Sequence, residues 1–274
     1  FNLGDRDLGT HLYRTQRLSE GASLSAVTAE IAAAWDLGLR LLPVTDDRLE
    51  TRVTVVDPDA EREVGFQEWF VQRRHDVPVR AVREHFGDAL MLQVDANAAY
   101  TMADARQLAR LDPFDLLLIE QPLAEDDLAG HATLAARLRT PICLDESITS
   151  ARVAAAAVTC GAAAVVNIKP GRVGGYLEAR RIHDVCAAHG VPVWVGGMLE
   201  TGLGRAANLG LAALPNCVLP GDISGSDRYF QRDVTEPFVV VGGQLPVPAG
   251  PGIGVDPDPA ALAAVTTSTE WLPL

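Results

Sequence analysis

Lysine is almost absent from this 274-residue chain. Of its 23 basic residues, only Lys169 is a lysine, and all the others are arginine. Arginine cannot exchange protons near neutral pH, whereas lysine can. Codon bias and chance could explain one surviving lysine, but its place at the end of the apolar run AVVNIKP makes chance the weaker explanation. We therefore treat Lys169 as a candidate for chemistry.

The chain also lacks a positive charge excess and any apolar run of membrane-spanning length. Its formal net charge of -13 argues against binding to nucleic acid or to an anionic membrane surface. The negative charge does not exclude anionic small substrates, because a bound cation can reverse the local field. The start, FNLGDRDLGTH, has neither the features of a signal peptide nor an initiator Met, so we expect the true N-terminus to be missing.

Cysteine is scarce as well. None of the four cysteines forms a C-x-x-C pair, so neither a zinc site nor a dense disulfide framework is indicated. Their scattered, mostly apolar surroundings predict small buried side chains in a reducing cytoplasm.

From Met91 onward, short apolar runs alternate with segments of helical length. This alternation predicts βαβ units around a parallel sheet of at least six strands, either an open doubly wound sheet or a closed barrel. The predicted strands lie within 91–97, 116–122, 141–147, 164–170, 192–198 and 217–223.

Four charged residues recur at nearly equal intervals along this repeat. Asp95, Glu120 and Asp145 follow one another at 25-residue spacing, and Lys169 comes 24 residues later. Each stands at the C-terminal end of its predicted strand, which is the edge where barrel active sites form. A single acid there is usually a helix cap or a surface charge, but three in phase can converge on one ion. Oxygen ligands favour Mg²⁺ or Mn²⁺.

The period-2 alternation of strands refines this set. It places Asn97 on the face of Asp95 and Asn167 on the face of Lys169, and it points Glu146 away from Asp145. The histidines are expected to be surface or packing residues rather than ligands: His11, His75, His85, His131, His183 and His189.

These motifs together resemble a known family. The runs QVDAN, LLLIEQP, CLDES, NIKPGRVGG and GGMLETGLGRAAN are similar to the enolase superfamily, and within it to the branch of o-succinylbenzoate synthase and the N-acylamino acid racemases, particularly actinobacterial members. The similarity covers roughly Val77 to Trp271. It implies an α/β fold, a (β/α)7β TIM-like barrel covered by a lid, toward which residues 242–255 would return.

The resemblance also implies roles for individual residues. Asp95, Glu120 and Asp145 would hold the magnesium ion, and Lys169 would be one of two active-site lysines. Asn97, Gly197 and Met198 would contact the substrate.

The N-terminal part departs from this pattern. The family's Lys-x-Lys motif should fall at Gln67-Glu68-Trp69, in the strand-like run 64–71, and no lysine is there. Residues 1–76 contain a predicted helix (24–42) and a predicted strand (51–57), but no recognisable lid motif. We therefore divide the chain into a divergent or incomplete lid and early-barrel region, 1–76, and a barrel region, 77–274. Residues 1–76 could be divergent but functional, the product of a rearranged gene, or translated partly from a shifted reading frame. We favour a rearrangement combined with a frameshift.

The function that the resemblance implies is o-succinylbenzoate synthase, a lyase of menaquinone biosynthesis that uses magnesium for a dehydration through an enediolate. The alternatives are an N-acylamino acid racemase, which uses the same chemistry, and a non-catalytic homologue that lacks the Lys-x-Lys base. In each case the partner is a small carboxylate, with no nucleic acid and no membrane. A homo-oligomer is compatible with all three.

Overall fold

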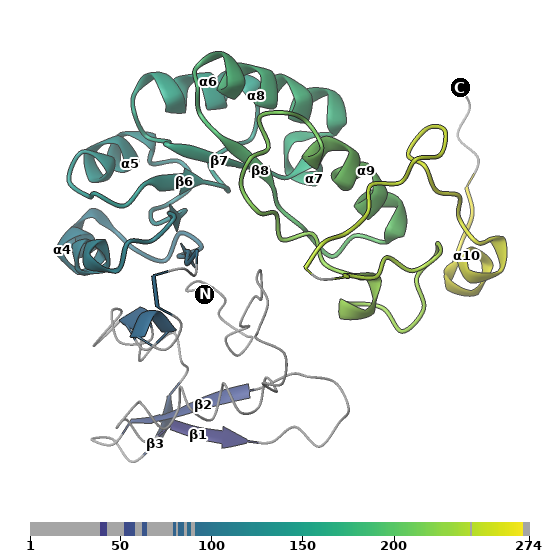
Figure 1. The fold of residues 1–274 in the computed structure, drawn as a ribbon, viewed down its shortest axis with the longest axis horizontal. Coiled ribbons are helices and arrows are strands. Elements are labelled where there is room, and N and C mark those ends of the chain that lie inside the picture. Colours follow the sequence, from purple (N-terminus) through teal and green to yellow (C-terminus); the bar gives the residue numbers. More distant parts are fainter. Residues whose placement is uncertain are drawn as a thin grey trace.

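The computed structural model describes two β-sheets and a layer of helices (Figure 1). One sheet is antiparallel and has three strands, and the other is parallel and has five. The described residues are 39–42, 52–57, 62–64, 79–80, 82–84, 87–88, 91–241 and 243–270.

The antiparallel sheet has the order β1 (Leu39–Leu42), β2 (Arg52–Asp57), β3 (Arg62–Val64). The strand predicted at 51–57 is confirmed as β2. The helix predicted over 24–42 is wrong at its end, because residues 39–42 pair with the β-branched run of β2, and Leu39 lies opposite Val55. The rest of that range and the Gln67-Glu68-Trp69 position lie outside the described residues.

The parallel sheet contains five strands in chain order, and it confirms the predicted α/β repeat. The sixth predicted strand contributes only one parallel bridge, between Val193 and Cys217. Each strand is the centre of a longer predicted run. The strands are β4 (Val94–Asp95), β5 (Ile119–Glu120), β6 (Ile142–Leu144), β7 (Val165–Ile168) and β8 (Val193–Val195).

Helices connect these strands and lie on the outer side of the sheet's arc (Figure 1). The first crossover is irregular, because 3-10 turns at Met102–Asp104 and Ala109–Phe114 flank the short helix α4 and Pro113 lies in the second turn. Helix α4 covers Ala105–Leu108. The helices after the later strands are α5 (Leu128–Ala135), α6 (Ala151–Thr159), α7 (Pro170–Val173), α8 (Tyr176–Ala188) and α9 (Gly202–Ala212).

Side chains pack on both faces of the sheet. The main core lies between the sheet and the helices, with residues such as Val166, Ile168 and Ile182 fully buried. A smaller cluster lies on the opposite face and consists of Leu118, Cys143, Val165 and Trp194. Adjacent strands supply its members, so it fills the concave side of the sheet.

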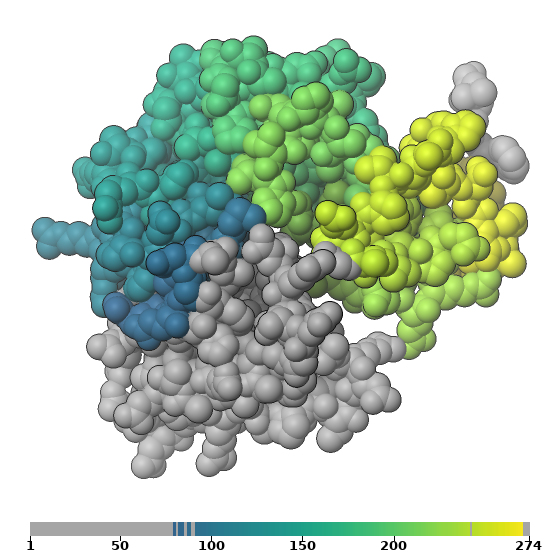
Figure 2. Space-filling view, in the orientation of Figure 1, coloured from purple at the N-terminus to yellow at the C-terminus, as the bar shows by residue number. Residues whose placement is uncertain are grey.

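The C-terminal part packs against α9. Phe238 is buried against Ala206 and Leu209, and Leu245 and Val255 cover this cluster. With α10 (Pro259–Val265), this part forms a lobe beside the main body (Figure 2). Whether 242–255 returns toward a lid depends on residues outside the described set. No helix within the described ranges is long and apolar enough to cross a membrane.

All four cysteines are free thiols. Cys143 and Cys186 are buried as predicted, and Cys217 is half-buried. The prediction is wrong for Cys160, which is exposed at the C-terminal end of α6, where the helix meets solvent.

His131 fixes the loop that follows β5. Its ring is fully buried, and Nε2 accepts a hydrogen bond from the Leu123 backbone N–H at 3.1 Å. Nδ1 therefore carries the proton, which it donates to the Asp127 carbonyl at 2.8 Å. Burial lowers the pKa of His131, so the neutral ring is the form that stabilises this loop.

The His131→Gln variant should unfold more easily than the wild type, and the difference should depend on pH. Loss of the two bonds should cost about 1 kcal/mol, or roughly 2–4 °C in melting temperature. Because the folded-state pKa lies below the ordinary value of 6.5, His131's contribution is complete above that pH and is lost as the pH falls below it. Thermal melts from pH 5 to 8 should show the gap narrowing toward low pH. A gap that widens toward low pH would contradict this assignment.

Candidate metal and proton-transfer site

The strand register brings the predicted acids to one edge of the sheet. Asp95 and Glu120 are direct partners in the β4–β5 ladder. Glu120 lies opposite Cys143, and Asp145 directly follows β6, two residues after Cys143. Lys169 directly follows β7. All four residues therefore stand at the carboxyl ends of neighbouring strands.

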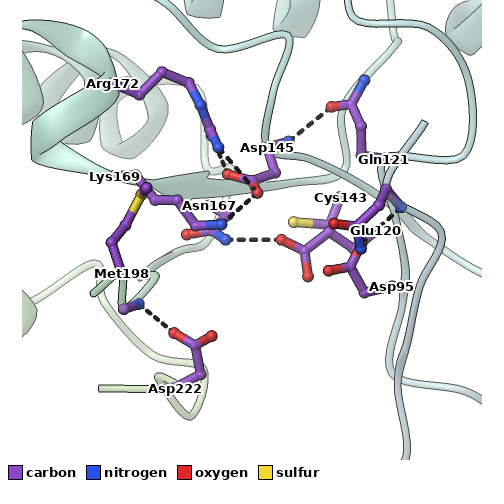
Figure 3. A network of polar contacts seen from close by, with 12 residues as sticks. Asp95, Glu120, Gln121, Cys143, Asp145, Asn167, Lys169, Arg172, Met198 and Asp222 are labelled. Atoms are coloured by element: carbon purple, nitrogen blue, oxygen red, sulfur yellow. Dashed lines mark hydrogen bonds and ion pairs between the residues drawn. The ribbon is translucent and has the colours of Figure 1, made fainter. Parts of the chain in front are cut away.

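Asp145 is bound by two cationic side chains (Figure 3). Lys169 Nζ lies 2.6 Å from Asp145 Oδ2, and the Arg172 guanidinium donates to both carboxylate oxygens. The Asp145 side chain is only 2% exposed, so both interactions are screened little by solvent. Both cations reach Asp145 because Lys169 directly follows β7 and Arg172 lies in α7, which begins at the next residue.

Asn167 connects the β7 end to Glu120. Its Nδ2 donates to Glu120 Oε1 at 2.7 Å. Its Oδ1 is buried and has no hydrogen-bond partner among the described residues. Such an acceptor is costly to leave unpaired, which marks this point as one where a donor or a cation would be stabilised.

Burial and mutual repulsion raise the pKa values of the acids. Burial raises the pKa of Asp95 to about 7, with further increases from the charges of Glu146 and Asp145. Burial and then the Asp95 charge raise the pKa of Glu120 well above its usual range. Burial lowers the pKa of Lys169, but its ion pair with Asp145 outweighs this, and the pKa ends above its usual value.

Glu146 was expected to point away from Asp145. Its charge nevertheless contributes to the raised pKa of Asp95, so it lies near the site. Alternation stops because β6 ends at Leu144 and the chain turns at residues 146–147. Glu146 Oε2 is buried and, within the described part of the chain, has no hydrogen-bond partner.

The loop after β8 borders the site. The Gly197 backbone N–H donates to the Asp222 carboxylate, which lies at the end of the sixth predicted strand. Met198 is half exposed, and its N–H donates to Glu200 Oε2 at 2.6 Å. A β-carbon at Gly196 would stand 2.5 Å from both Asn167 Oδ1 and Lys169 Cε, so glycine is required there.

The backbone is strained where the site begins. Asn97, Ala98 and Gln121 adopt left-handed φ angles of 43°, 57° and 35°. Such non-glycine conformations cost about 1–3 kcal/mol each and persist only where the surroundings hold them. The Asn97 N–H donates to Asp95 Oδ1 at 2.9 Å, so the turn after β4 orients that carboxylate.

The donor set suits a hard divalent cation. Asp95, Glu120 and Asp145 supply oxygen ligands. Burial, with a further contribution from neighbouring carboxylates, raises the pKa values of Asp95 and Glu120, and a bound cation would favour their ionised forms. As the side chains lie, no three His, Cys, Asp or Glu residues within the described ranges already form an ion-binding group. Asp145 faces Lys169 and Arg172 instead.

Sequence comparison identifies the class of this domain. The family model described as "Enolase C-terminal domain-like" matches residues 53–261. The parallel, barrel-like sheet with acids at its carboxyl edge is therefore an enolase-type barrel domain.

Comparison with individual proteins narrows the class. An N-succinylamino acid racemase from Amycolatopsis sp is 71% identical over 195 residues, which make up 71% of this chain and 53% of that protein. An o-succinylbenzoate synthase from Geobacillus kaustophilus is 55% identical over 181 residues, 66% of this chain and 48% of that protein. The chain spans about half the length of these curated relatives.

A solved structure agrees with these relatives. The crystal structure of an enolase-superfamily member from Listeria innocua Clip11262 has a TM-score of 0.68 and is 45% identical, covering 70% of this chain and 52% of that one. The chain belongs to the enolase superfamily, and over the matched residues it is similar to the superfamily's N-succinylamino acid racemases and o-succinylbenzoate synthases. Members of this superfamily use a divalent metal ion, typically Mg²⁺.

Sequence reasoning missed four residues that the structure adds to the site. Arg172 lies three residues after Lys169, one turn into α7, which the pattern did not predict as a helix. Asp222 ends the sixth apolar run, and this position could have been counted with the other strand ends. Gln121 and Glu146 each follow a predicted ligand directly, and no simple periodicity identifies them.

The ligand role of Asp145 can be tested by calorimetry with Mg²⁺. The Asp145→Asn variant should bind the ion at least about tenfold more weakly, because one anionic oxygen ligand is lost. Asp112→Asn is the control, since Asp112 accepts hydrogen bonds from Arg139 and Thr140 before the start of β6, at the opposite end of the strand. Equal affinity in wild type and Asp145→Asn would remove Asp145 from the ligand set.

Proposed function

We propose that this chain carries the metal-binding half of an active site that removes the hydrogen alpha to a carboxylate. The observation that carries the proposal is the row of acids at neighbouring strand ends, with Asp95 and Glu120 paired in the ladder, Asp145 directly after β6, and Lys169 bound to Asp145. Asp95, Glu120 and Asp145 would hold the ion. A bound Mg²⁺ would stabilise the negative charge that develops on the substrate carboxylate as the proton leaves.

Lys169 is proposed as the group that moves the proton. The ion pair with Asp145 keeps Lys169 as an ammonium ion, which can donate a proton. It loses that stabilisation when the charge of Asp145 is engaged elsewhere, and its amine form can then accept a proton. Gly196 leaves the stem of Lys169 room to reach the substrate's alpha carbon.

Substrate contacts are assigned to the edge of the same site. Asn97, Gly197 and Met198 border it from the loops after β4 and β8, and the partly exposed Met198 offers apolar contact. A small carboxylate bearing an acyl or ring substituent fits this mixture of buried charge and apolar rim.

Among the two activities of the branch, N-succinylamino acid racemisation is better supported. The Amycolatopsis relative with 71% identity is a racemase of this kind, whereas the o-succinylbenzoate synthase from Geobacillus kaustophilus is 55% identical. o-Succinylbenzoate synthesis is the second candidate, because several relatives at 46–55% identity are synthases. Both reactions would use the same ligands and the same lysine.

The chain itself provides a lysine on only one side of such a substrate. Lys169 is its only lysine, and the expected Lys-x-Lys position reads Gln67-Glu68-Trp69. Racemisation needs a proton donor on each face, and synthase activity needs a base as well. A homologue with a metal site and little turnover is therefore the remaining alternative.

Three further expectations belong to this proposal. The division into an incomplete lid region, 1–76, and a barrel region, 77–274, stays a prediction, although the family match already begins at residue 53. A cytoplasmic location and a homo-oligomer stay predictions as well.

One-sided proton chemistry predicts a specific result with N-succinyl amino acids. With Mg²⁺ in deuterated water, the chain should exchange the alpha hydrogen of one enantiomer slowly and should racemise it more slowly still. Proton NMR measures the exchange and polarimetry measures the racemisation. Lys169→Arg should abolish both, because arginine keeps the charge but cannot give up its proton near neutral pH.

The control for this experiment is Arg137→Lys, which adds an exposed lysine after the C-terminal end of α5 and before β6, at the opposite edge of the sheet from the site. It should behave as the wild type. Racemisation as fast as exchange would contradict the one-sided account, and exchange by Lys169→Arg would remove Lys169 from the proton-transfer role. Dehydration of the synthase's cyclohexadiene carboxylate, measured in parallel, decides between the two candidate activities.

A further inference from the structure

Gln121 forms the junction between the three strand ends that carry the acids. It directly follows Glu120 at the end of β5, and its side chain is fully buried. Its backbone N–H donates to the Cys143 carbonyl at 2.8 Å, and its carbonyl accepts from the Ala98 N–H at 2.7 Å. The main chain of one residue therefore connects β6 on one side and the turn after β4 on the other.

The side chain of Gln121 adds four hydrogen bonds, three to the turn after β6 and one to its own loop after β5. Oε1 accepts from the backbone N–H of Asp145 at 3.0 Å and from that of Ser147 at 3.2 Å. Nε2 donates to Ser147 Oγ at 2.8 Å and to the Leu123 carbonyl at 3.0 Å. The amide uses both lone pairs and both hydrogens, so its orientation is completely determined.

These bonds form at a backbone that is itself strained. Gln121 has a left-handed φ of 35°, which residues with a side chain seldom adopt. Only a side chain of this length that accepts two hydrogen bonds and donates two can make all four contacts with Asp145, Ser147 and Leu123. Asparagine is one methylene too short, and glutamate has no hydrogen to donate when ionised.

We propose that Gln121 is a positioning residue for the metal site, which it serves by fixing the backbone of Asp145 relative to Glu120. It binds no substrate and no ion itself. Its amide sets where the chain turns after β6, and the Asp145 carboxylate is directed from that turn. This inference rests on the proposed function, because it concerns the ion that Asp95, Glu120 and Asp145 would hold.

Groups that orient metal ligands are energetically important even though they do not touch the metal. Their loss commonly lowers metal affinity by 10–100-fold. A residue that only supports the fold would lower the melting temperature without a selective effect on metal binding. The two roles can therefore be separated by measuring both quantities on the same variants.

The test is calorimetric titration of the whole chain with Mg²⁺, together with thermal melting. Gln121→Met keeps the length of the side chain and removes all four of its hydrogen bonds. We expect its Mg²⁺ affinity to fall by about 10–100-fold at a temperature well below its melting point. Ile182→Ala is the matched control, because Ile182 is fully buried in α8 within the outer core and should lower the melting temperature while leaving the affinity unchanged.

Ser147→Ala provides a milder second variant. It removes one acceptor of the Gln121 amide but keeps the Ser147 backbone N–H, so the affinity should fall several-fold with little unfolding. If Gln121→Met does not fold, this variant decides the question. Wild-type affinity in either folded variant, or an equal loss in Ile182→Ala, would overturn the positioning role. If the wild-type chain itself binds no Mg²⁺, the proposed metal site fails and this inference fails with it.

Discussion

Repulsion between buried carboxylates is the constraint to which the rest of the site responds. Asp95 and Glu120 lie side by side in the β4–β5 ladder, with Asp145 and Glu146 at the end of the next strand. Such a group of acids is stable only beside positive charge or with some of its members protonated. Lys169 and Arg172 supply that charge to Asp145. Burial, with a further contribution from neighbouring carboxylates, raises the pKa values of Asp95 and Glu120.

Apolar packing on the two faces of the sheet offsets the free-energy cost of burying these acids. The outer face packs against α5, α6 and α8 and supplies the large apolar core. The inner face carries a small apolar cluster around Cys143 and Trp194, directly below the acids. The charged groups therefore stand at or directly after the last residue of each strand, along the carboxyl edge of the sheet.

Much of this could be predicted from the sequence, because the repeat is nearly constant in length. A spacing of 24–25 residues placed Asp95, Glu120, Asp145 and Lys169 at equivalent strand ends, and the structure has them there. Glu146 could not be predicted by alternation, since the strand ends at Leu144 before the rule could apply. Gln121 and Arg172 depend on how turns and a short helix direct their side chains, and such local geometry has no period in the sequence.

Gly196 has a consequence for the evolution of this site. Every other residue type carries a β-carbon, and at position 196 that atom would collide with both Asn167 and Lys169. A mutation there cannot alter the wall of the site by itself, since it must also displace the lysine and the amide that binds Glu120. Selection for a new substrate therefore has to act on neighbouring loop positions such as the exposed Leu199, where side-chain size can change while the lysine stays in place.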